Sequence, residues 1–233
     1  MPGSHNRWMD LGAKGAAFIV RFVFPDTCAG CGAAGSWMCE LCERELVEIS
    51  EGWRLGASRS TSLDDALQGG AAAVGLRARF VFAGPARKAV HLLKYGGERA
   101  RAGWFAQIIE PILPPADGDM AVFVPVPLTE RRQRKRGYNQ SAEIANHLSQ
   151  RTGIPVVSAA LRVRETQPQV ELNGIERLHN VRGAFSATQA VKGKHVILID
   201  DVVTTGATMR ECGRACYAAG ALSVTGVAAT AGR

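Results

Sequence analysis

Toward its C-terminus the chain reads Val196-Ile197-Leu198-Ile199-Asp200-Asp201-Val202-Val203-Thr204-Thr205-Gly206-Ala207-Thr208. Four consecutive aliphatic residues predict a strand that is buried on both faces, as the strands of parallel sheets are. A pair of carboxylates, Asp200 and Asp201, stands at the C-terminal end of this strand. A hydroxyl-rich turn with Gly206 then leads directly into a predicted helix. Because open α/β sheets bind ligands at the carboxyl ends of their strands, this stretch predicts both the fold class and the binding edge.

The turn after the strand has the chemistry of a phosphate site. A helix N-terminus offers unpaired N–H groups and a positive dipole end, and Thr204, Thr205 and Thr208 add hydroxyl donors. The acid pair beside it suits ribose hydroxyls or Mg²⁺, which takes one or two carboxylates plus substrate phosphates. The alternative is an ordinary strand-end acid pair followed by a threonine N-cap. The sequence has no GxxxxGK[ST], which disfavours nucleotide hydrolysis of the P-loop type.

Strand and helix patterns alternate through the second half of the chain. Helices are predicted at 86–95, 101–110, 139–151 and 212–219, where Cys212 and Cys216 indicate buried packing. Strands are predicted at 121–126, 156–157, 196–199 and 222–228. This alternation indicates a mostly parallel sheet flanked by helices. We expect three parts: residues 1–50 with a helix and a cysteine module, a connector at 51–85, and an α/β domain at 86–233. One or two short strands are expected within 45–75.

Four of the six cysteines form two CxxC pairs, Cys28 with Cys31 and Cys39 with Cys42. Two intervening residues let both thiolates of a pair reach one ion, and two such pairs complete the tetrahedral shell of a structural zinc. Gly30 helps the first pair to turn tightly. The alternatives are two disulfides or a redox CxxC, but clusters of this kind in proteins that are not exported are more often metal sites. We therefore predict a structural zinc module with no ligand position open for catalysis.

The charge and the hydropathy pattern limit the cellular setting. The net charge of +7 favours phosphorylated or nucleic-acid partners without choosing between them. No apolar stretch is long enough for a transmembrane helix, and no signal-peptide cleavage site is evident, so a cytoplasmic location is expected. The residue pattern over 8–24 predicts a helix with an apolar face beside a basic stripe. That helix either packs on the body of the protein or lies on a membrane surface as a peripheral contact.

With these features in place, the chain resembles the ComF family, the amidophosphoribosyltransferase-like competence proteins of the type I phosphoribosyltransferase superfamily. The resemblance extends over nearly the whole chain, in family order. It is carried by the four-cysteine cluster and by Phe24-Pro25, Leu93-Lys94-Tyr95, Val124-Pro125-Val126-Pro127-Leu128, Arg136-Gly137-Tyr138-Asn139-Gln140, Thr166-Gln167-Pro168-Gln169, Asn180-Val181-Arg182-Gly183-Ala184-Phe185 and Asp200 to Thr208.

The resemblance implies a role for each part of the site. The signature loop would hold the 5′-phosphate of phosphoribosyl diphosphate (PRPP), and Asp200 and Asp201 would contact the ribose 2′- and 3′-hydroxyls. The loop residues are Thr204, Thr205, Gly206, Ala207 and Thr208. Pyrophosphate contacts are expected after Val126-Pro127-Leu128, where the cations are Arg131, Arg132, Arg134, Lys135 and Arg136. The same cations could instead bind the DNA or RNA backbone or form a solvated face.

A mobile loop over residues 164–185 is also implied, with Arg177, Asn180 and Arg182 as phosphate-facing candidates. Ordinary hinge or surface residues would look the same in the sequence. Lys94 and Tyr95 are further candidates, and the alternative for them is an amphipathic helix end. Asn139 is expected to cap the helix that follows it.

Two functions remain open from this resemblance. The first is an enzyme that binds Mg²⁺-PRPP and transfers the phosphoribosyl group to an unidentified acceptor, in DNA uptake, natural transformation or DNA utilisation. The second is a non-catalytic adaptor that senses PRPP or a nucleotide and binds single-stranded DNA or competence-machinery proteins. A phosphate-binding loop shared with the family does not by itself decide between these two functions.

Overall fold

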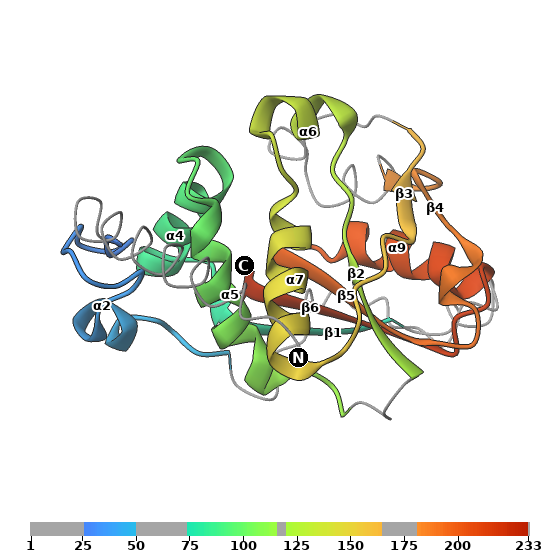
Figure 1. Cartoon of the computed structure of the whole chain (residues 1–233), viewed down its shortest axis with the longest axis horizontal. Coiled ribbons are helices and arrows are strands. Elements are labelled where there is room, and N and C mark those ends of the chain that lie inside the picture. The colour runs from blue at the N-terminus through green and yellow to red at the C-terminus, as the bar shows by residue number, and fades with distance from the viewer. Residues whose placement is uncertain (1–25, 50–73, 116–119, 165–180, 233) are drawn as a thin grey trace, which may run out of the picture.

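A computed structural model describes residues 26–49, 74–115, 120–164 and 181–232. Its centre is a four-stranded sheet in the order β1-β6-β5-β2, and every neighbouring pair is parallel (Figure 1). The strands are β1 (Gly75–Val81), β2 (Ala121–Pro125), β5 (His195–Val203) and β6 (Ser223–Ala231). The predicted α/β fold with a mostly parallel sheet is confirmed.

Helices cover both faces of this sheet. One face packs against α4 (Gly84–Tyr95), α5 (Ala102–Ile109) and α7 (Gln140–Thr152), and the other packs against α9 (Ala207–Ala218). Because successive side chains of a strand point to opposite faces, Ile197 and Ile199 join the first core cluster, while Val196 and Leu198 join the second. The run of four aliphatics is therefore explained by burial on both sides, and Cys212 and Cys216 are buried in the second cluster as expected.

The expected helices match α4, α5, α7 and the C-terminal half of α9, and Asn139 caps α7 by accepting a hydrogen bond from the Ser141 N–H at 3.0 Å. No helix was predicted between the strand at 121–126 and the helix at 139–151, but this stretch contains α6 (Glu130–Arg136). Thr129 Oγ1 caps this helix by accepting from the Arg132 N–H, and Gly137 ends it in the left-handed conformation. Its seven residues lack an apolar periodicity, which is why only the caps indicate it.

Other short elements complete the described chain. These are α2 (Glu40–Arg44), the 3-10 helices η1 (Arg99–Arg101), η2 (Glu110–Ile112) and η5 (Gln189–Val191), and an antiparallel ribbon of β3 (Ala160–Arg162) and β4 (Phe185–Ala187). The strand predicted at 156–157 is reduced to a parallel bridge between Phe123 and Val156.

Two strands differ in extent from their predictions. β5 continues through both acids to Val203, because β6 pairs with it as far as Ala231; the acid pair thus lies inside the strand rather than after it. β1 falls within the expected connector and forms an edge of the main sheet beside β6. The division of the chain into three parts otherwise stays a prediction. The predicted helix at 8–24 lies outside the described residues, and within the described ones no helix is long and apolar enough to cross a membrane.

Candidate functional site

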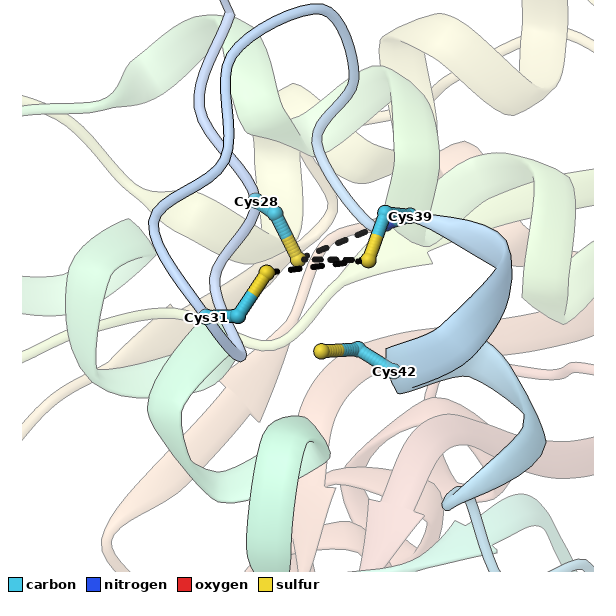
Figure 2. Close-up of side chains that lie close together, drawn as sticks. All are labelled: Cys28, Cys31, Cys39 and Cys42. Atoms are coloured by element: carbon cyan, nitrogen blue, oxygen red, sulfur yellow. Dashed lines mark hydrogen bonds between the residues drawn. The ribbon is translucent and has the colours of Figure 1, made fainter.

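The four N-terminal cysteines converge on one point, as Figure 2 shows. Their sulfur atoms all lie within 4.8 Å of one another, with Cys39 Sγ 3.6 Å from Cys28 Sγ and 3.7 Å from Cys31 Sγ. Four thiolates about 2.3 Å from a tetrahedral zinc would lie roughly 3.8 Å apart, whereas a disulfide requires about 2.05 Å. All four are free cysteines, so the cluster can hold a metal ion such as zinc.

The backbone around the cysteines is shaped for this convergence. A Cβ on Gly30 would lie 2.4 Å from Cys42 Sγ, and Gly32 takes the left-handed conformation at φ 79°. The Cys39 N–H donates to Cys28 Sγ at 3.3 Å. Burial opposes ionisation of Cys28, but backbone N–H groups at Cys31, Cys39 and Gly30 outweigh it and lower its pKa to about 6. Deprotonation of this kind is what a thiolate ligand needs.

One arginine joins the cysteine module to the body of the protein. The Arg101 side chain is 0% exposed, and its guanidinium donates to the Trp37 carbonyl at 2.7 Å and to the Thr27 carbonyl at 3.1 Å. It also pairs with the Glu98 carboxylate and lies over the Trp37 ring. On the neighbouring helix, Lys88 Nζ donates to the Gly30 carbonyl at 2.8 Å.

The acid pair occupies the other candidate site, and its two carboxylates have different surroundings. Asp201 is 1% exposed; its Oδ2 lies 2.6 Å from Lys94 Nζ, and its Oδ1 accepts from Gln140 Nε2 at 3.2 Å. Asp200 is half-buried, and its Oδ1 accepts from Ser141 Oγ and from the Asp201 N–H, both at 2.9 Å. Three segments far apart in sequence, the ends of α4 and β5 and the start of α7, therefore meet here.

These surroundings move the two pKa values in opposite directions. Burial, followed by the neighbouring charge of Asp201, raises the pKa of Asp200. Burial also opposes ionisation of Asp201, but the charge of Lys94 and the hydrogen bonds to its carboxylate hold its pKa below the usual range. Two adjacent buried acids cannot both ionise freely, and the position of Lys94 decides which one is charged.

The loop after β5 has the geometry expected of the start of a helix. Gly206 is left-handed at φ 76°, and a Cβ there would lie 2.6 Å from Leu76 Cδ1. Thr205 Oγ1 accepts from the Ala207 N–H at 3.4 Å, and Ala207 begins α9. Thr204, Thr205 and Thr208 are half-buried in this turn. Arg210, which the sequence interpretation missed, donates to the Thr205 carbonyl at 2.7 Å from the first turn of α9.

The basic residues divide into two groups. Arg131, Arg132, Arg134 and Lys135 are exposed on α6, which projects away from the sheet at the top of Figure 1. Arg134 pairs with Glu130 at 3.1 Å. Arg136 points back toward the acid pair: its guanidinium lies over the Tyr95 ring, 5.3 Å from the centroid, and donates to Gln140 Oε1. Among the described residues, no ion pair or hydrogen bond joins Arg131 or Arg132 to Asp200 or Asp201.

The predicted mobile loop is described only at its two ends. Arg177 and Asn180 lie outside the described residues. Arg182 is exposed, and its carbonyl accepts from Arg164 Nη2 at 3.0 Å, while the Gly183 N–H donates to Glu211 of α9 at 2.9 Å. β3 and β4 pair at the base of this segment. Its role over the ligand stays a prediction.

Gln140 and Ser141 were not predicted as site residues. Gln140 had been noted only as part of a family motif, and nothing in the local sequence indicates that a helix N-terminus at 140 faces a strand at 200. The predicted cap at Asn139 places Gln140 and Ser141 in the first turn of a helix, where anions are favoured. It could therefore have indicated these two as site residues.

Comparison with known proteins agrees with this geometry. A family described as phosphoribosyl transferase domain matches residues 120–232. The DNA utilization protein YhgH of Escherichia coli K12 is 38% identical over 103 residues, which cover 44% of this chain and 45% of that protein.

Two further relatives carry competence names. Competence protein F of Haemophilus influenzae is 38% identical over 93 residues, covering 38% of this chain and 41% of that protein. Competence protein ComFC of Bacillus subtilis is 31% identical over 93 residues, covering 40% and 37%. The matched segments thus span less than half the length of each of these relatives.

Proposed function

Since the chain is a phosphoribosyltransferase-like protein of the ComF family, we propose that it binds a phosphorylated ribose at the carboxyl edge of its sheet, with Mg²⁺-PRPP as the ligand. One observation carries this proposal: the acid pair of β5, the N-terminus of α7 and the turn into α9 lie together at one edge. A helix N-terminus suits the phosphate, and a carboxylate suits hydroxyls or a hydrated cation.

Each group has a task in this proposal. The loop 204–208 would hold the 5′-phosphate through backbone N–H groups and threonine hydroxyls. Lys94 occupies Asp201, so Asp200 is the carboxyl group left for the ribose hydroxyls. Burial and the charge of Asp201 raise its pKa, so near neutral pH it would carry a proton and could donate to one hydroxyl as well as accept from another. A magnesium ion would take most of its ligands from water and from phosphate. Arg136, together with Arg131, Arg132 and Arg182, would supply positive charge toward the pyrophosphate group.

Such an arrangement supports transfer of the phosphoribosyl group. An acceptor would form a bond to the anomeric carbon while the bond from that carbon to the pyrophosphate oxygen breaks. The electron pair leaves with pyrophosphate. Fixed cations aimed at the departing group stabilise the transition state more than the ground state. In the cell, the names of the relatives point to a role in DNA uptake or DNA utilisation.

Calorimetric titration with PRPP, with and without Mg²⁺, tests the proposal. We expect Mg²⁺-dependent binding that Asp200→Asn weakens about tenfold, as loss of a well-placed hydrogen-bond partner of the ribose hydroxyls does. The matched control is Glu40→Gln, which removes a carboxylate from the exposed side of α2. Pyrophosphate released in the same mixture separates turnover from sensing. No binding at any Mg²⁺ concentration would contradict the proposal.

A second candidate function rests on α6. Arg131, Arg132 and Lys135 are exposed cations of this helix. A fourth, Arg134, lines a hollow of about 280 Å³ together with Pro127, Leu128 and Glu130. Such a surface suits the backbone of single-stranded DNA, which would make this protein a PRPP-responsive adaptor. Because phosphate contacts release counterions, binding of a single-stranded oligonucleotide should weaken steeply with salt. Arg131→Ala with Arg132→Ala should reduce the slope, and a salt-independent affinity would exclude this candidate.

A further inference from the structure

The two carboxylates of the acid pair are not equally available to a ligand. Both oxygens of Asp201 are engaged, one by Lys94 and one by Gln140, and the side chain is 1% exposed. On Asp200, Oδ1 is engaged by Ser141 and the Asp201 N–H. The side chains of Asp200 and Asp201 are also hydrogen-bonded to each other. Because only Asp200 is partly exposed, it is the member of the pair that a ligand can reach.

Lys94 is held in place from several directions. It lies in the last turn of α4, where the helix dipole favours a cation, and its side chain is 21% exposed. The Tyr138 hydroxyl donates to the carbonyl of the preceding residue, Leu93, which is itself 0% exposed. The Tyr95 ring, on the other side, lies under Arg136. The end of α4 is thus fastened to the α6–α7 junction, with Lys94 directed at Asp201.

The charge of Lys94 has a definite consequence for Asp201. A buried carboxylate without a partner is costly, so it either takes up a proton or moves to another donor. Asp201 is joined to Asp200 by the hydrogen bond from its own N–H to Asp200 Oδ1. A change at Asp201 would therefore displace Asp200 as well.

We propose that Lys94 is a positioning residue: by pairing with Asp201 inside the fold, it leaves Asp200 as the single carboxyl group that contacts the ribose hydroxyls of the ligand. This inference rests on the proposed function and sharpens it, since the family resemblance assigns the hydroxyls to both acids. Lys94 itself touches no part of the ligand. The recognised chemistry is a ribose with a 5-phosphate, in which the phosphate binds independently of Lys94.

Titrations with ribose 5-phosphate and with inorganic phosphate, on folded full-length variants, test this role. We expect Lys94→Met and Asp200→Asn each to weaken ribose 5-phosphate about tenfold and to leave phosphate binding unchanged. The double variant Lys94→Met with Asp201→Asn replaces the ion pair by a neutral pair. It should return to within about threefold of the unaltered chain. Arg87→Met, which removes an exposed cation from the same helix, is the matched control and should change nothing.

The outcomes separate the two levels of the proposal. If the folded double variant binds as weakly as Lys94→Met, or if phosphate binding falls with Lys94, then Lys94 contacts the ligand and the positioning role is wrong. An Asp200→Asn variant with full affinity also overturns it. If Lys94→Met does not fold, the double variant and Asp200→Asn still decide. If the unaltered chain binds phosphate but no ribose 5-phosphate, the proposed function itself fails.

Discussion

The cysteine module and the acid-pair edge are built in opposite ways. In the module, all four chemical groups come from fifteen residues, 28–42, and short turns bring the sulfurs together. At the edge, Lys94, Gln140 and Asp201 come from three separate elements. They meet only because α7 packs against β5 and α4 shares a core cluster with both. Local spacing can specify a metal centre, whereas a ligand site of this kind depends on the whole sheet.

The two regions also differ in whether they leave a position free for a ligand. The module uses four protein sulfurs, so a tetrahedral ion there has no free position for a substrate. The edge keeps Asp200 half-exposed beside two helix N-termini. We therefore expect the module to stabilise the structure and the edge to bind the ligand. Arg101 joins the module to the body of the protein through the Trp37 and Thr27 carbonyls.

Removing a sulfur from the module should have the largest effect. We expect Cys42→Ala to abolish stoichiometric zinc binding and unfold the module, because a structural zinc in small domains is worth about 10–16 kcal/mol. Metal analysis of the purified protein measures this directly. Cys212→Ala, at a buried cysteine of α9, is the control and should keep its zinc. A Cys42→Ala protein with one bound zinc would remove the basis of the comparison.

Removing the contacts of Arg101 should have an intermediate effect on stability. Arg101→Met leaves the Trp37 and Thr27 carbonyls and the Glu98 carboxylate without their shared donor, and we expect it to lower the free energy of unfolding by about 3 kcal/mol. Urea denaturation measures the change. Arg99→Met is the matched control. Arg99 is 63% exposed in its pair with Glu143, so its loss should lower the free energy of unfolding much less. Equal losses in the two variants would show that burial of Arg101 carries no special weight.

The smallest effect is expected from pH at the edge. Burial, then the charge of Asp201, raises the pKa of Asp200 from 3.8 to about 8. The folded state therefore keeps a proton that the unfolded chain releases, so this contribution to stability is present below pH 4 and is lost as the pH rises toward 8. Asp200→Asn removes that dependence. Relative to the variant, the unaltered protein should lose about 1 kcal/mol between pH 5 and 8, a small value because a half-exposed group is screened.

Thermal or urea unfolding of both proteins at several pH values measures this difference. A constant difference would mean that the two acids of the pair have ordinary pKa values, and the contrast between a buried and an available carboxylate would then have to be given up.

The sequence predicted an element of the fold correctly where its residue pattern is compatible with only one environment. The run 196–199 indicated a doubly buried strand, and Asn139 indicated a helix start. Patterns without such a signal were missed. α6 consists of polar residues only, and β5 extends past the acids because of its partner β6. Neither the helix α6 nor the full length of β5 is indicated by the residues of its own segment.

Residues close together in the chain were enough to predict the α/β class and the cluster of four cysteines, and they predict a turn of phosphate-binding type before α9. The packing of distant segments was needed to show that Asp201 pairs with Lys94 while Asp200 stays partly exposed, and that Arg101 fastens the cysteine module to the body. The physical reason is distance along the chain. A partner a hundred residues away leaves no periodicity, and its charge acts on a carboxylate only after folding has removed the water between them.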